Sequence, residues 1–254
     1  MRTVFSYKWD ILLEYFGVAL NLIVITICFG HLSTLIVIPT YKNDNLVLYY
    51  QSVALLSSLF SVCNIVTYQT WSDINSGELS GYLCRPIDYM YLNYINVLSS
   101  FLILLPIWAL GTWLCIVLQS NNINFSFDKI AYLSFCIFLS LTLQYLIFFC
   151  IGVLSFYIKK SLSIRDFYFV FGIIFSGQLI PVDLLPNIMQ KIANYLPFRH
   201  VFYSPIKILL CNDESLGNYT PVLFVQALWI FVFFVAARVL YLHGLTRYES
   251  QEIR

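Results

Sequence analysis

The chain has 254 residues, of which 60% are apolar and only 11% are charged. Soluble globular domains carry about 45–50% apolar and about 25% charged residues, so this much apolar surface requires lipid as its solvent. A formal net charge of +1 excludes nucleic acid as an electrostatic partner. Since the bilayer favours structures that satisfy every backbone polar group internally, the composition predicts an all-α integral membrane protein.

The N-terminal residues have the pattern of a helix that lies in the membrane interface. Phe5, Trp9 and Leu12 recur at spacings of four and three, so they share one helical face. Arg2 and Asp10 fall on a polar stripe. A basic helix with an aromatic face, placed just before a span, is typical of the cytoplasmic interface. A frayed tail is the alternative.

Six segments are predicted to cross the membrane, for which a helix needs about 20 mostly apolar residues. The fifth is short, because its apolar run stops at Pro181, and proline breaks a helix. It crosses only if its polar start is included. Together the spans form one transmembrane domain over residues 1–254. The predicted spans are residues 16–38, 46–68, 95–119, 130–158, 163–180 and 222–242.

Residues 181–210 follow the fifth span and alternate apolar residues with prolines. Irregular backbone exposed to lipid is not tolerated, so this segment must lie at the interface or be buried against protein. We expect a re-entrant helical hairpin between spans five and six, on the side opposite the termini. An ordinary loop is the alternative, but it would leave Ile188, Ile192 and Phe202 in water.

The basic residues set the direction of the chain. With both termini in the cytoplasm, the short outer loops hold only Lys42 and Lys129. This asymmetry follows the positive-inside rule. The inner segments then hold Arg2, Lys8, Arg85, Lys159, Lys160, Arg165, Arg247 and Arg254. Arg238 lies near the inner end of the last span, from where it can snorkel to the interface.

The chain contains no recognisable energy source of its own. It has no GxxxxGK[ST] phosphate loop, because Lys160 and Ser161 lack the preceding glycines. The spans carry no mid-membrane carboxylate to couple an ion gradient. Cysteines and histidines have no metal-ligand spacing, and the odd number of seven cysteines predicts no disulfide framework. We therefore expect no catalytic, cofactor or metal residue; energy for uphill transport would have to come from another protein.

The loop over residues 69–94, between the second and third spans, is the predicted entry point for that energy. A short helix with one apolar face and a few charges could dock in a groove of a soluble partner. Pro86 would end this helix, since the residue before a proline avoids the α conformation. A solvated loop is an equally open alternative. The predicted contact residues are Ile74, Gly77, Glu78, Leu79, Tyr82, Leu83, Arg85 and Pro86.

The same loop resembles the "I-x-x-G-x-L … L-x-R-P" signature of type-2 ATP-binding cassette (ABC) permeases, in the short subfamily with a separately encoded ATPase. Two further stretches are similar to that family, and the match covers essentially the whole chain. One is the "S-G-x-x-x-P … L-P … L-P-F" segment, made here by Ser176, Gly177, Pro181, Leu185, Pro186, Leu196, Pro197 and Phe198. The other is the "G-x-x-R-Y" tail that begins at Gly244.

The resemblance implies a bacterial inner-membrane subunit of an ABC transporter, more specifically an exporter. It implies a coupling helix over residues 77–85 that contacts a nucleotide-binding ATPase subunit, which would bind the ATP and magnesium. Residues 177–198 would close the extracellular exit, and Phe5, Trp9 and Leu12 would belong to a connecting helix. The second partner would be another permease chain, as a homodimer or a heterodimer.

Two functions from other classes stay open at this point. A non-transporting membrane scaffold or assembly subunit would be equally compatible with spans that lack a polar pathway. A gradient-driven carrier is disfavoured by the missing mid-span carboxylates.

Overall fold

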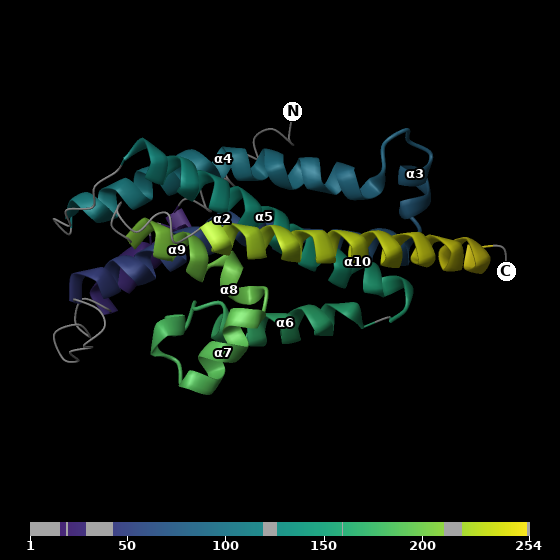
Figure 1. Ribbon diagram of the computed structural model, residues 1–254. Coiled ribbons are helices and arrows are strands. Elements are labelled where there is room, and N and C mark those ends of the chain that lie inside the picture. The colour runs from purple at the N-terminus through teal and green to yellow at the C-terminus, as the bar shows by residue number, and fades with distance from the viewer. Residues whose placement is uncertain are drawn as a thin grey trace, which may run out of the picture. The chain divides into compact units, whose positions relative to one another are not determined.

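The computed structural model describes residues 16–18, 20–28, 43–118, 126–158, 160–210 and 220–252. Within these ranges the chain is helical, without a β-strand (Figure 1). The named helices are α2 (Asn43–Ser76), α3 (Leu79–Leu83), α4 (Tyr89–Leu118), α5 (Phe127–Val153), η1 (Leu154–Phe156), α6 (Ser161–Phe175), η2 (Val182–Leu184), α7 (Asn187–Tyr195), α8 (Phe198–Val201), α9 (Tyr203–Leu210) and α10 (Thr220–Glu252).

Four helices of the described residues are long and apolar enough to cross a membrane, namely α2, α4, α5 and α10. They coincide with the second, third, fourth and sixth predicted spans, which confirms a helical, multi-pass membrane protein. The first predicted span is described only over part of residues 16–28, and α6 has only 15 residues. The six-span count and the re-entrant hairpin therefore stay predictions.

The chain divides into two compact units, and the boundaries fall inside α2 and α4. The first unit holds residues up to Leu59 together with Leu102–Asn124. Within it, the Gln51 amide donates a hydrogen bond of 2.8 Å to the Thr26 hydroxyl. The second unit holds Phe60–Phe101 and Phe125–Arg254. All structural features discussed below belong to this second unit.

Helix α5 is the centre of the second unit. It packs along α10 and also contacts α6, α8 and α9 (Figure 1). On its α2 side, the Thr67 hydroxyl donates a hydrogen bond of 2.8 Å to the Phe148 carbonyl oxygen. Gly152 allows a close approach there, because a Cβ atom on it would lie 2.8 Å from the Cβ of Thr70. Small residues of this kind let membrane helices pack backbone to backbone.

Helix α6 ends earlier than the sequence predicted. Pro181 was the expected helix breaker, but the last helical residue is Phe175. Gly177 adopts φ +83°, a left-handed conformation that glycine reaches without the penalty of a Cβ atom. The Leu179 amide then donates back to the Ile173 carbonyl oxygen at 3.2 Å. A glycine turn, and not the proline, therefore stops the helix.

Residues 181–210 form the short helices η2, α7, α8 and α9 in place of an irregular loop. Helices α8 and α9 pack against α5, so this part of the segment is buried against protein. An ion pair of 2.5 Å between Lys207 and Asp183 ties α9 to η2. Helix α7 instead exposes Ile188, Met189 and Tyr195, an apolar surface that water would not favour.

We expect Gly152→Ala to destabilise the protein, because the added Cβ would have to displace Thr70 in a close-packed helix interface. Overpacking of this kind costs about 1–3 kcal/mol. The midpoint temperature of thermal unfolding in detergent should fall. Gly81→Ala is the matched control, since a Cβ on Gly81 meets nothing within 4 Å. Equal midpoints for the two variants would contradict the close α2–α5 packing.

Candidate functional site

The candidate site is the connection between α2 and α4, and its shape begins with Gly77. Helix α2 ends at Ser76, and Gly77 turns the chain with φ +83°. The Ser80 amide and hydroxyl both donate to the Gly77 carbonyl oxygen, at 3.3 and 2.7 Å. A side chain at position 77 would strain this conformation. The glycine therefore directs the chain into α3, a short helix of five residues.

Helix α3 divides the predicted contact residues into an inner and an outer group. Leu79 is completely buried, and Ile74 is 9% exposed, so both pack within the chain. Leu83 is 39% exposed, and Ile87, just beyond the helix, is 50% exposed. Glu78, Gly81, Arg85 and Pro86 also lie at the surface. The surface open to a partner is therefore narrower than the sequence predicted.

Aromatic contacts join this outer surface to the start of α4. The Tyr82 and Tyr89 rings meet edge to face, with centroids 5.4 Å apart. The Arg85 guanidinium lies 4.7 Å from the centroid of the Tyr82 ring, a cation–π contact that holds its charge at the surface. Tyr82 is thus a structural support for Arg85 as well as part of the loop.

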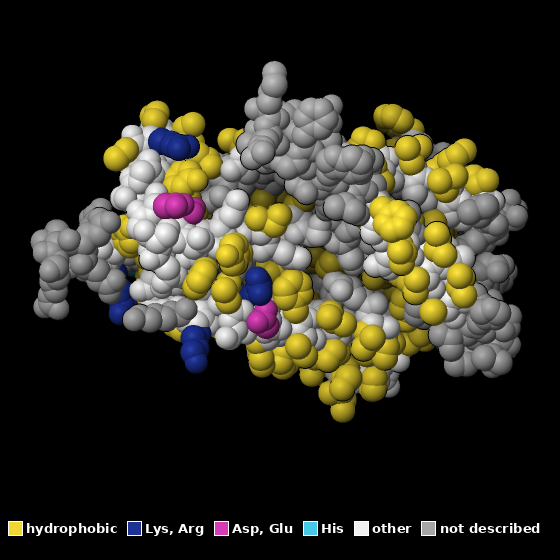
Figure 2. Space-filling view, turned by 180° about the vertical axis from the view of Figure 1, so that it is seen from behind, with side chains coloured by type: hydrophobic (Ala, Val, Ile, Leu, Met, Phe, Trp, Pro, Cys, Tyr) yellow, Lys and Arg dark blue, Asp and Glu magenta, His cyan; other side chains and the backbone are white. Residues whose placement is uncertain are grey.

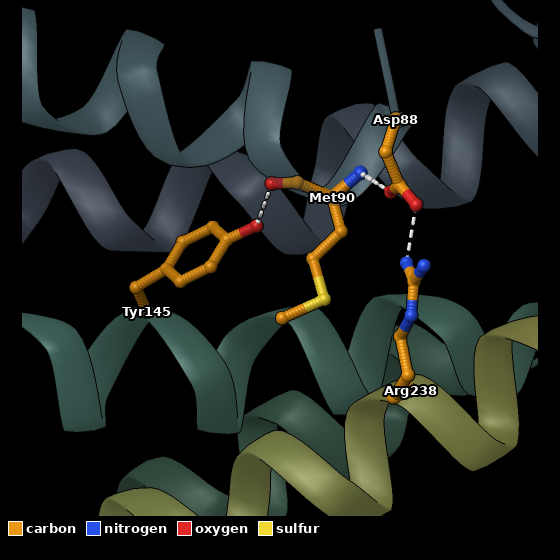
Figure 3. A network of polar contacts seen from close by, with 4 residues as sticks. All are labelled: Asp88, Met90, Tyr145 and Arg238. Atoms are coloured by element: carbon orange, nitrogen blue, oxygen red, sulfur yellow. Dashed lines mark hydrogen bonds and ion pairs between the residues drawn. The ribbon is translucent and has the colours of Figure 1, made fainter.

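Asp88 anchors the base of the connection with both oxygens of its carboxylate (Figure 3). One oxygen accepts a hydrogen bond of 3.0 Å from the Met90 amide. An aspartate before the first helical residue satisfies a free amide of the first turn in this way, so Asp88 caps α4. The other oxygen pairs with the Arg238 guanidinium on α10. A single side chain therefore links α4 and α10.

Two tyrosines extend this link to α5 and α2. The Tyr145 hydroxyl, on α5, donates to the Met90 carbonyl oxygen (Figure 3). The Tyr89 hydroxyl donates to the Asp73 carboxylate on α2 at 2.6 Å. Four helices are thus connected within one turn of the α4 start. We call this set the anchor cluster; its members are Asp73, Asp88, Tyr89, Met90, Tyr145 and Arg238.

The sequence did not point to most of the anchor cluster. Arg238 was expected to reach the interface by itself, but the structure pairs it with Asp88. The two residues lie 150 positions apart, and a single sequence carries no signal for that pairing. One local signal was available: Asp88 precedes a long apolar run and follows Pro86, which is typical of a helix N-cap.

The residues predicted for the extracellular gate lie around the end of α6 and the ends of α7. Ser176 and Gly177 form the turn after α6, and Pro181 precedes η2. Pro186 lies directly before α7, and Leu196 and Pro197 join α7 to α8. The Phe198 ring packs against the Tyr168 ring of α6, with centroids 5.3 Å apart. The interfacial-helix residues Phe5, Trp9 and Leu12 lie outside the described residues.

A second polar cluster, to which the sequence does not point, lies between α5, α8 and α10. The Gln226 amide nitrogen donates to the Ser140 hydroxyl and to the His200 carbonyl oxygen, at 2.8 and 3.0 Å. The Ser140 hydroxyl donates to the same carbonyl oxygen at 3.0 Å. Burial, and secondly Arg199, lowers the pKa of His200 to about 4, so its imidazole is neutral at neutral pH. The cluster is uncharged and serves to join the three helices.

The described residues contain no group of three or more His, Cys, Asp or Glu side chains that could hold a metal ion. What the site offers is an exposed helix on a firmly connected base, in a protein with several membrane-spanning helices. This arrangement defines a polytopic membrane protein whose α2–α4 connection is joined to several of its helices.

The sequence model of the family described as "ABC-2 family transporter protein" matches residues 16–252. The chain therefore belongs to the ABC-2 family, whose members are membrane components of ABC transporters. This result agrees with the resemblance that its motifs show. Neither a curated protein nor a solved structure gives a match to the chain.

We expect Asp88→Asn to lower thermal stability, because it leaves the Arg238 cation unpaired while the asparagine still caps α4. Asp88→Ala should lose about 1 kcal/mol more, since the cap is lost as well. The double variant Asp88→Asn/Arg238→Gln should recover part of the loss, which a double-mutant cycle of unfolding midpoints measures. Fully additive effects of the two substitutions would show that the ion pair carries no coupling.

Proposed function

We propose that this chain is the transmembrane subunit of an ABC exporter, driven by ATP hydrolysis in a separate nucleotide-binding subunit. That subunit docks on the cytoplasmic connection between α2 and α4. The chain functions in the bacterial inner membrane with both termini in the cytoplasm, and it pairs with a second permease chain, either identical or similar. The observation that carries the proposal is the combination of the exposed α3 surface with the anchor cluster behind it.

The exposed residues of α3 suit a protein contact. Leu83 and Ile87 present apolar surface, and Glu78 and Arg85, which carry opposite charges, are exposed in the same segment. Interfaces of this kind combine an apolar centre with a charged rim that fixes orientation. Because Leu79 is buried and Arg85 rests on Tyr82, α3 would meet its partner as a formed helix. Less conformational entropy is lost when such a preformed surface binds.

The anchor cluster supports the transmission of movement from this contact into the membrane. A displacement of α3 acts on the start of α4, where Asp88 and Tyr89 lie. From there, Arg238 connects the start of α4 to α10, Tyr145 connects it to α5, and Asp73 connects it to α2. Packed helices that are joined by polar contacts move as rigid bodies and do not deform continuously. Closure of the ATPase subunits upon ATP binding would therefore tilt several spans together.

The orientation can be tested with a native cysteine. Cys84 is exposed in the α3 loop and Cys28 is exposed as well, whereas Cys63, Cys136 and Cys150 are buried. We expect a membrane-impermeant maleimide to label Cys84 in inside-out vesicles and not in intact cells. The variant Cys84→Ser assigns the label to this position. Labelling of Cys84 from the outside of intact cells would overturn the cytoplasmic placement of α3, and with it the proposed docking.

The docking can be tested with the double variant Glu78→Lys/Leu83→Ala. It reverses a rim charge and removes exposed apolar surface, without touching the buried Leu79 or the anchor cluster. We expect binding to the proposed nucleotide-binding ATPase subunit to fall about tenfold, since truncation of a central contact costs more than about 1 kcal/mol. Binding is measured with both proteins purified, and ATP hydrolysis by the complex is measured in parallel.

The matched control is Lys191→Glu, a charge reversal at an exposed position of α7, on the proposed extracellular side. It should leave ATPase binding unchanged. Unchanged binding and hydrolysis in the Glu78→Lys/Leu83→Ala variant would contradict the proposed docking site. Stable insertion without any association with an ATPase would instead favour a membrane scaffold.

A further inference from the structure

Besides the α2–α4 connection, the second unit contains an apolar groove along α6. Its volume is about 560 Å³, within the range of about 300–1,000 Å³ that small-molecule sites occupy. One wall comes from α5 with Ile147, Cys150 and Ile151, and Phe233 of α10 adds to it. Leu196, Pro197 and Phe198 close one side. The lining residues carry no charge, so the groove suits a hydrocarbon chain.

The groove follows the length of α6. Its lining residues on this helix are Ile164, Phe167, Tyr168, Phe171 and Phe175, which recur every three or four positions and form one stripe. The stripe runs from the first turn of α6 to its last residue. A ligand that fills it is therefore elongated, with one end near the η1–α6 turn and the other near Phe175.

Basic residues gather at the η1–α6 end of the groove. Lys160 directly precedes α6, is exposed, and lies one helical turn before Ile164. Arg247 of α10 lies with its guanidinium 5.7 Å from the Tyr157 ring in the same turn. Arg165 is paired with Asp166, so this pair adds no net charge. Lys160 thus adds a positive charge at this end of the groove, while the floor of the groove is apolar.

The surroundings of the groove are apolar as well. Figure 2 shows hydrophobic side chains gathered in a patch in the lower part of the view, where α6 and α7 lie. Phe167, Val170 and Phe171 of α6 and Ile188 of α7 are exposed. In a membrane protein such a surface faces acyl chains. The groove is therefore open to a lipid without any rearrangement of the helices.

We propose that this groove binds one acyl chain of an anionic phospholipid, with the phosphate headgroup at the Lys160 end. A hydrocarbon tail matches the apolar stripe, and the phosphate matches the positive charge. Basic residues near an anionic membrane surface are attracted to its phosphate groups. In the orientation proposed above, this end lies at the cytoplasmic leaflet. The bound lipid would support the short helix α6 on its exposed side.

The test is photo-crosslinking of the purified chain, without any ATPase, in phosphatidylcholine nanodiscs with a trace of a diazirine-labelled lipid. The probe is phosphatidylglycerol with the diazirine near the end of one acyl chain. We expect adducts in the peptide that contains Phe171 and Phe175 and in the α5 peptide around Ile147. Adducts spread evenly over the exposed apolar helices, including α4, which contributes no residue to the groove, would overturn the proposal.

Groove-filling variants distinguish lipid binding in this groove from lipid contact elsewhere on the protein. Ile164→Trp fills the groove and should lower adduct yield about tenfold, since two displaced methylene contacts suffice for that loss. Val170→Trp is the matched control, because Val170 lies on α6 outside the groove and is exposed. Ile151→Phe fills the groove from α5 and replaces Ile164→Trp if that variant does not fold, as judged by monodispersity and unfolding midpoint.

The proposed contact with the lipid headgroup is tested by changing the charge at position 160. Lys160→Gln should lower the preference for phosphatidylglycerol over the corresponding phosphatidylcholine probe about fivefold, and Lys160→Arg should retain it. Unchanged adduct yield in the groove-filling variants would refute the site. Loss of self-association with unchanged lipid labelling would identify a second copy of this chain as the occupant. Because no ATPase is present, these outcomes are independent of the proposed docking on α3.

Discussion

The α2–α4 connection depends on the two contacts that the Asp88 carboxylate makes, a helix cap and an ion pair. A charged group near the hydrocarbon region is costly unless it is paired, and Asp88 is satisfied from two sides, by the Met90 amide and by Arg238. The first contact starts α4, and the second fixes α4 to α10. The same residue therefore solves a local problem of helix capping and a tertiary problem of charge pairing.

Around this carboxylate, the protein combines a narrow exposed surface with a well-connected base. The outer residues Leu83 and Arg85 are available for a partner, whereas Leu79 and Tyr89 are buried. Separation of this kind lets a soluble subunit bind without disturbing the packing beneath it. Tyr145 and Asp73 join the base to α5 and α2, so a partner bound at the surface would act on more than one span.

The hydrocarbon region of the bilayer, in which an unpaired charge is costly, also explains the apolar groove. Helix α6 has only 15 residues and gains its contacts from α5 on one side and from α8 at its end. The remaining side presents an apolar stripe with a basic end. A lipid chain there would bury surface that protein does not cover, which is the physical reason for placing a lipid and not water in the groove.

The sequence by itself determined the membrane class, four of the long helices and the family, because these depend on composition, apolar run length and short motifs that one chain carries locally. It also located the α3 loop by its mixture of apolar and charged residues. The tertiary structure decided which of those residues face outward, that Gly177 and not Pro181 ends α6, and that Arg238 pairs with Asp88. Burial and ion pairing depend on contacts between residues that are far apart in the chain. The local spacing of residues in a single sequence does not show which distant positions come into contact.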